Sequence, residues 1–167
     1  MIFVTVGTHE QAFDRLLKWI DKMVEEKIIK EKVIVQKGYT DYESKNCESY
    51  KLLGYDEMQN FIAEARIIIT HGGPASFIAP LSIRKIPIVV PRKKEFNEHV
   101  NNHQLEFARE VEKRMKNIIV VESYEEMVES ITNYEEKIKE IAGSMMSHNQ
   151  VFNEEFEKEI EKMMLKK

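Results

Sequence analysis

The chain has 167 residues, of which 43% are apolar and 32% charged, with only six glycines and four prolines; this is the composition of one folded domain rather than of a disordered or fibrous chain. The net charge of −4 argues against a general attraction to nucleic acid or anionic lipid, although Arg92, Lys93 and Lys94 form a short basic run. A single cysteine, Cys47, excludes an intrachain disulfide and a cysteine-based zinc site, and it fits a reducing compartment.

Short apolar runs rich in β-branched residues alternate with helical patterns along the chain. Continuous runs of this kind are typical of strands buried on both faces of a parallel sheet. Helical stripes lie between them, the first at Phe13, Leu16, Leu17, Ile20 and Val24 and the second at Met58, Phe61, Ile62 and Ala65. The expected strands are Ile2–Val6, Lys32–Gln36, Arg66–Thr70, Pro87–Val90 and Asn117–Val121, with Tyr50–Leu53 as a weaker sixth. The alternation predicts an α/β fold, a doubly wound parallel sheet of Rossmann-like type.

The end of the chain differs from the rest. We expect a first domain over residues 1–147 and a separate amphipathic helix over 148–167. Its apolar stripe comprises Phe152, Phe156, Ile160, Met163 and Met164, in a highly charged setting. Two interpretations are open: the helix packs on its own domain, or it docks on another chain, either a different subunit or, without that subunit, a second copy of this chain in a homodimer.

In doubly wound sheets, ligands bind outside the carboxyl ends of the strands. This rule selects the loops Gly7–Gln11, Gln36–Tyr39 and His71–Ser76. In the last, a buried strand ends at Thr70, and His71, Gly72 and Gly73 lead into a helix near Ala75 and Ser76. Paired glycines permit close backbone approach, and a helix N-terminus attracts anions. The turn therefore predicts a diphosphate site, and a tight strand–helix connection is its structural alternative.

The other two loops have structural alternatives as well. Thr8 and Gln11 have the spacing of a helix capping box, which alone would explain them. Gln36 and Gly38 form a third polar strand exit. Three such exits on one rim favour a binding site over folding requirements alone.

Hydrogen-bonding side chains crowd the stretch that follows the strand ending at Val90. Sugar hydroxyls both donate and accept, so they need partners of this kind. The candidates are Asn97, Glu98, His99, Asn102, His103 and Gln104. The alternatives are a solvated loop with Asn102 as a helix cap, and a metal site, since His99 and His103 are four residues apart. The order His-Glu-x-x-His of zinc proteases is missing, so we expect no metal.

Three motifs in sequence order resemble one family. They are Met1–Thr8, the turn His71-Gly72-Gly73-Pro74, and Ile86–Pro91 followed by Glu98–Gln104. Together they resemble the PssE-type proteins of bacterial polysaccharide synthesis and, more widely, the C-terminal donor-binding half of GT-B glycosyltransferases of family 28. They are also similar to the catalytic subunit of the eukaryotic two-part dolichol-linked N-acetylglucosamine transferase. The resemblance extends from residue 1 to about residue 115.

The resemblance implies an inverting, metal-independent hexosyltransferase that uses a UDP-sugar as substrate, with galactose, glucose and N-acetylglucosamine as the open choices of sugar, and that needs no cofactor. It implies that Gly72, Gly73, Ala75 and Ser76 contact the diphosphate, together with His71, and that Asn102, His103 and Gln104 contact the sugar. Gly7 and Thr8 would lie beside the donor, and Gln36 and Gly38 near the nucleoside. Relatives often carry an acidic residue for the ribose in the helix after the glycine turn, but Phe77–Leu81 has none; Glu98 is our replacement. Pro80 in this stretch predicts a short or kinked helix.

A complete GT-B enzyme has two such domains, so the resemblance implies a PssD-like, membrane-associated partner that binds a lipid-linked acceptor. No apolar run reaches the ~20 residues that span a bilayer, and the first residues lack a signal-peptide pattern. We expect a cytoplasmic protein held at the inner face of the plasma membrane through its partner. His9 is the candidate general base, because an imidazole titrates near neutral pH, and Glu10 is the reserve.

Two other functions are open. The chain could be a non-catalytic subunit that enhances a partner carrying the donor site. A weaker alternative is an epimerase-like or hydrolytic enzyme, which the missing Gly-x-Gly-x-x-Gly and Gly-x-Ser-x-Gly motifs disfavour.

Overall fold

In the computed structural model, the described residues are 1–145 and 149–165, and the described side chains exclude those of 143–156. A six-stranded sheet forms the centre, in the order β3-β2-β1-β4-β5-β6. Every neighbouring pair of strands is parallel. The strands are β1 (Ile2–Thr5), β2 (Val33–Gln36), β3 (Glu48–Tyr50), β4 (Ile67–His71), β5 (Ile88–Val90) and β6 (Ile119–Val120). The predicted α/β doubly wound parallel sheet is confirmed.

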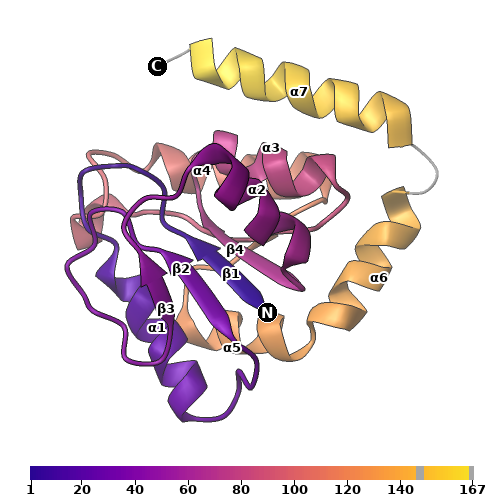
Figure 1. Cartoon of the computed structure of the whole chain (residues 1–167). Helices are drawn as coiled ribbons and strands as arrows, with labels where there is room; N and C mark the ends of the chain where they lie inside the picture. Colours follow the sequence, from indigo (N-terminus) through magenta and orange to yellow (C-terminus); the bar gives the residue numbers. More distant parts are fainter. Residues whose placement is uncertain (146–148, 166–167) are drawn as a thin grey trace.

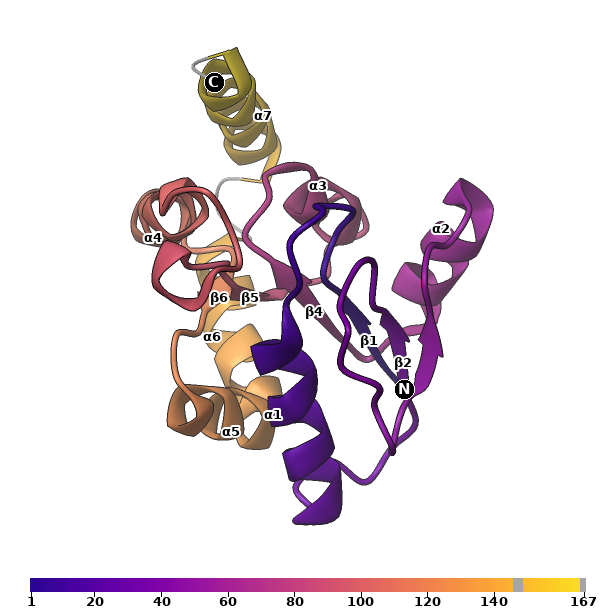
Figure 2. The same ribbon diagram turned by 90° about the vertical axis from the view of Figure 1, so that its left-hand side faces the viewer.

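Helices cover both faces of the sheet (Figures 1 and 2). One face carries α1 (Asp14–Glu25), α5 (Tyr124–Thr132) and α6 (Tyr134–Met145). The other face carries α2 (Tyr55–Glu64), α3 (Ala75–Ser82) and α4 (His103–Met115), with α7 (Asn149–Leu165) lying outside them. A 3₁₀ turn, η1 (Lys94–Phe96), interrupts the connection between β5 and α4. Among the described residues, no helix has the length and apolar character needed to cross a membrane.

Alternation along each strand separates the core into two faces. Ile2, Val4, Ile67 and Ile69 are among the fully buried residues on the α1 and α5 side. Phe3, Ile34 and Ile68 face α2, and Val89 and Val120 face α4, because successive side chains on a strand point to opposite faces. The continuous apolar runs in the sequence arise from burial on both faces.

The structure corrects several local predictions. The weak strand expected at Tyr50–Leu53 is β3, three residues long and starting at Glu48. The capping box is wrong: α1 starts at Asp14, and the position before it is Phe13, which makes no side-chain cap. Pro80 lies inside α3, which is short at eight residues, as expected.

Asp21 of α1 anchors the polar loop before β3. Its carboxylate accepts hydrogen bonds from the Tyr42 hydroxyl (2.7 Å), from Ser44 Oγ, and from the amides of Lys45 (3.1 Å) and Asn46 (3.3 Å). Burial raises the pKa of the neighbouring Cys47 thiol to about 11. Since the thiolate is the reactive form, this cysteine is poorly suited to be a nucleophile.

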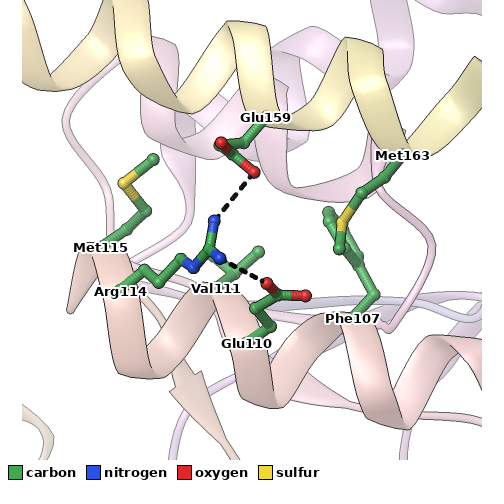
Figure 3. A pocket seen from close by; sticks show the side chains of 7 residues that line it. All are labelled: Phe107, Glu110, Val111, Arg114, Met115, Glu159 and Met163. Atoms are coloured by element: carbon green, nitrogen blue, oxygen red, sulfur yellow. Dashed lines mark hydrogen bonds and ion pairs between the residues drawn. The ribbon is translucent and has the colours of Figure 1, made fainter.

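The last helix folds back on its own chain through its C-terminal half. Ile160 is 2% exposed and packs with Phe107, Val111 and Met115 of α4, and Met163 lies over the same cluster. Arg114 bridges Glu110 and Glu159 (3.1 Å each) across a crevice of only about 10 Å³ between the two helices (Figure 3). Phe152 and Phe156 belong to side chains outside those described. Docking of α7 on a partner stays a prediction, and the packing on α4 matches the other interpretation.

Candidate functional site

From β1 the chain adds β2 and β3 on one side of the sheet, and then β4, β5 and β6 on the other. The neighbouring strands β1 and β4 therefore mark the point where the strand order reverses. At such a switch point the two following loops diverge and leave a crevice at the carboxyl ends of the strands. Gly7 follows β1, and the turn His71-Gly72-Gly73 connects β4 to α3. The predicted loops 7–11 and 71–76 therefore meet where this fold usually binds its ligands.

The His71 imidazole is wedged between two of the predicted glycines. A Cβ added to Gly7 would lie 2.4 Å from His71 Nε2, and one added to Gly73 would lie 2.4 Å from His71 Cε1. Gly7 also has φ +79°, a region that favours glycine. These two glycines are therefore required to make room for a protein side chain, whereas the sequence alone suggested room for a ligand.

Hydrogen bonds determine which nitrogen of His71 carries its proton. Nδ1 accepts from the Gly73 amide at 3.1 Å and lies 3.3 Å from Gln104 Nε2, so the proton of the neutral ring is on Nε2. Burial, and then the positive charge of Arg92, lower the pKa of His71 to about 3. His71 is consequently neutral at pH 7 and offers one donor, Nε2–H, on the side of Gly7.

The start of α3 offers fewer amides than the glycine pair suggested. The Gly72 amide donates to Gln104 Oε1 (3.1 Å), the Gly73 amide donates to His71, and Pro74 has no N–H. In the part of the chain that the structure describes, the Ala75 amide donates to no acceptor. Ser76 Oγ donates to the carbonyls of His71 (3.0 Å) and Gly73 (2.5 Å). Ala75 N–H and the positive end of α3 are thus the groups open to an anion here.

Gln104 holds three segments together. Its Oε1 accepts from the amides of Gly72 and Arg92, both at 3.1 Å, and its Nε2 approaches His71 Nδ1. The residue is only 9% exposed. This geometry does not support the prediction that Gln104 contacts the sugar, because its polar atoms already bind the protein.

Glu98 is likewise committed to the protein. Its carboxylate makes two 2.9 Å contacts with Arg15 of α1 and accepts from the Lys93 amide at 3.0 Å. Arg15 in turn lies over the rings of Trp19 (4.7 Å) and Phe96 (4.9 Å). Glu98 is only 2% exposed and is held in this bidentate ion pair, so a ribose or sugar has little access to it and the structure gives no support to that prediction.

A recess of about 440 Å³ opens beside this ion pair, between α1 and the segment 96–98. Its charged lining residues are Asp14, Arg15, Lys18 and Glu98, so two negative charges balance the two positive ones, and the Arg15 guanidinium is already paired with Glu98. We therefore do not assign the diphosphate to it.

Gln36 is buried in β2 and also makes structural contacts. It accepts from the Leu53 amide at 3.1 Å and donates to Thr5 Oγ1 at 3.4 Å. These contacts give no support to its assignment to the nucleoside, which stays a prediction. Gly38 has φ +53°, and a Cβ there would approach the Gly7 carbonyl oxygen to 2.6 Å. Its role is close packing of the β1 and β2 loops.

The side chain of His9 is held on two sides. Its Nε2 lies 2.8 Å from Gln11 Oε1, and its ring stacks on His99 with centroids 4.5 Å apart. Because Gln11 Nε2 donates to the Asn97 carbonyl (3.1 Å), its Oε1 is the atom that faces His9. In the neutral ring, Nε2 therefore carries the proton and Nδ1 is the basic nitrogen. Thr8 and Glu10 are exposed in the same loop.

Asn102 and His103 are exposed at the start of α4. Asn102 does not cap the helix with its side chain: its Oδ1 accepts from the Lys94 amide at 2.9 Å. Of the proposed sugar contacts, these two are the accessible ones. Among the described residues, no three His, Cys, Asp or Glu side chains gather as a metal ligand set would.

Sequence reasoning missed the importance of Arg92 and Gln11. Arg92 was only part of a basic run, yet it is 0% exposed and bonds the carbonyls of Val6, Gln11 and Glu98. Its place directly after a strand and Pro91 was the available signal. Gln11 was explained by a capping box that does not form.

Comparison with known proteins gives one result. The family model described as "Glycosyltransferase family 28 C-terminal domain" matches residues 1–164, which is nearly the whole chain. The match extends well beyond residue 115, where the resemblance of the motifs ends. No curated protein matches the sequence.

Proposed function

This chain belongs to the glycosyltransferase family 28 C-terminal domains, and on that premise we propose that it binds a UDP-sugar at the carboxyl edge of its sheet. With a PssD-like, membrane-associated partner, it would transfer a hexose to a polyprenyl-diphosphate-linked acceptor in polysaccharide synthesis at the inner face of the membrane. The family is one of glycosyltransferases. Donor, acceptor, partner and pathway are our proposal.

One observation carries the proposal: the exits of β1 and β4 meet at the switch point, with a neutral histidine donor and a helix N-terminus beside each other. The Ala75 amide, the start of α3 and His71 Nε2–H together form a set of fixed donors suited to a diphosphate. Such donors would stabilise the UDP leaving group as its negative charge develops, without a divalent cation. Asn102 and His103 would bind sugar hydroxyls.

In this mechanism His9 Nδ1 takes the proton of the acceptor hydroxyl. As it does so, the hydroxyl oxygen bonds to the anomeric carbon of the sugar, while the bond between that carbon and the diphosphate breaks and UDP leaves. Gln11 and His99 support this role by holding the ring from two sides. Glu10 is the reserve base. His71 is unsuited to be the base, since its lowered pKa makes the ring a weak base and its Nδ1 already accepts a hydrogen bond.

A matched pair of His71 variants tests the diphosphate site by calorimetry. His71→Asn keeps an acceptor near the position of Nδ1 but lacks the Nε2–H donor, and His71→Gln keeps a donor near Nε2. We expect His71→Asn to lose about tenfold or more in UDP affinity, the usual effect of losing a hydrogen bond to a charged group, and His71→Gln to lose less. Equal UDP affinity in both variants and the unaltered chain would remove His71 from the site.

Transfer assays on each subunit and on their mixture test the function itself. We expect UDP binding by this chain alone and sugar transfer by the mixture. If only the partner binds UDP, this chain is the non-catalytic subunit. A chelator that abolishes transfer, with restoration by a divalent cation, would contradict the metal-independent mechanism.

A further inference from the structure

Arg92 is a fully buried cation under the switch point. It follows β5 and Pro91 and is 0% exposed. Its Nη1 donates to the carbonyls of Gln11 (2.6 Å) and Glu98 (2.9 Å), and its Nη2 donates to that of Val6 (2.7 Å). The guanidinium therefore connects the β1 exit to the segment that leads into α4.

No carboxylate neutralises Arg92 by direct contact among its described partners. The nearby Glu98 carboxylate pairs with Arg15 instead, and the bonds from Glu98 to Arg92 use only the main-chain oxygen. Arg92 Nε has no acceptor in the part of the structure that is described. Burial lowers the pKa of Arg92 to about 10, so the guanidinium still carries its charge at pH 7.

The charge acts on the proposed diphosphate turn. Val6, which accepts from Arg92, immediately precedes Gly7, and the Arg92 amide shares Gln104 Oε1 with the Gly72 amide. The positive charge of Arg92 is also the second cause, after burial, of the lowered pKa of His71. The field of the guanidinium thus extends to the ring that lies beside Gly73.

We infer that Arg92 is an electrostatic positioning residue, whose buried positive charge favours the diphosphate of a bound nucleotide and its increasing charge as the sugar leaves. The inference rests on the proposed function and deepens it. A charge fixed in a low-dielectric interior needs no reorganisation during the reaction, and it acts on an anion without touching it. It also keeps the loop of His9 in place through the Gln11 carbonyl.

Paired ligands separate the electrostatic role from a merely structural one. UDP and uridine share the nucleoside, but only UDP carries negative charge. We expect Arg92→Met to weaken UDP binding about tenfold or more, which is the size expected for one buried charge acting on a diphosphate, and to leave uridine affinity within about twofold. Arg92→Lys keeps the charge and should retain most of the UDP affinity.

Lys93→Met is the matched control, because it removes a neighbouring charge that Glu122 already pairs at 2.9 Å. We expect it to change UDP affinity little. Unchanged UDP affinity in Arg92→Met, or equal losses of UDP and uridine, would overturn the inference and leave Arg92 as a structural residue.

If Arg92→Met does not fold, Arg92→Gln takes its place, because it removes the charge but keeps hydrogen-bond donors for the three carbonyls. A loss of UDP affinity that exceeds the loss of uridine affinity, and that Arg92→Lys does not show, supports the inference; equal losses of the two ligands, or none, refute it. Failure of the unaltered chain to bind UDP would refute the proposed function, and this inference with it. Normal UDP binding by the unaltered chain and by Arg92→Met would refute the inference alone.

Discussion

Replacing Gly7 by alanine tests the arrangement around His71 most directly. The new Cβ would lie 2.4 Å from His71 Nε2 and 2.8 Å from Cε1, so the ring must move. The backbone at Gly7 has φ +79°, which costs an L-residue roughly 1–2 kcal/mol. Movement of the ring would also deprive the Gly73 amide of its acceptor, at a cost of about 1–3 kcal/mol. We expect a total loss of about 2–5 kcal/mol in the free energy of unfolding.

Urea unfolding followed by circular dichroism measures this loss. Gly54→Ala is the matched control: a Cβ there meets nothing within 4 Å, and its cost at the start of α2 should stay below about 1 kcal/mol. Adding His71→Ala to Gly7→Ala removes the clash but not the backbone strain. The double variant should therefore be more stable than the sum of the single changes indicates, by about 1 kcal/mol or more. Additive effects, or a Gly7→Ala no worse than Gly54→Ala, would refute the wedged position of the ring.

Three further predictions concern stability and binding. The folded-state pKa of about 3 for His71 lies below the 6.5 of a free histidine, so the unfolded chain takes up a proton that the folded chain refuses. This contribution to the free energy of unfolding is fully present above pH 6.5, and it should fall by up to about 1.4 kcal/mol per pH unit as the pH is lowered towards 3. A His71→Asn variant lacks the group, so the same pH dependence of unfolding in that variant and in the unaltered chain would contradict the prediction. Gln104→Ala leaves the amides of Gly72 and Arg92 without an acceptor, so it should lower the free energy of unfolding in urea by about 1–3 kcal/mol or more. It should also weaken the binding of UDP and of UDP-sugar equally. A loss of affinity for UDP-sugar alone would show that Gln104 contacts the sugar. Truncation after Ser147 removes the contact of Ile160 with α4 and should lower the free energy of unfolding by about 1.5–3 kcal/mol. We predict that it also abolishes capture of the PssD-like partner in a pull-down. Normal capture by the folded, truncated chain would exclude docking through α7.

The sequence by itself determined the architecture. Continuous β-branched runs such as 67–70, alternating with helical stripes such as that of α1, are compatible with a parallel sheet covered on both faces and with little else. The same periodicity located the strand ends, and with them the loops 7–11 and 71–76 at the rim. These are local properties of the chain, determined by the spacing of apolar residues over a few turns or strand positions. For the same reason β3, with only three residues, was located less accurately.

Only the tertiary structure decided which polar side chains are available to a ligand. The sequence places three polar residues at or after strand ends, and so at the predicted rim: Gln36, Glu98 and Gln104. Their hydrogen-bond partners come from other segments of the chain and are Leu53, Arg15 and Gly72, respectively. Of the glycine pair that suggested a phosphate site, Gly73 accommodates the ring of His71, and Gly72 makes room for Gln104. A buried polar group that finds no partner costs desolvation free energy, and its partner depends on the packing of distant segments: Arg15 and Glu98 are 83 residues apart, and Arg92 and Val6 are 86 apart. No local pattern of residues shows which distant group a polar side chain will bind. The sequence therefore located the rim of the candidate site, but not the side chains that are used up in contacts within the protein.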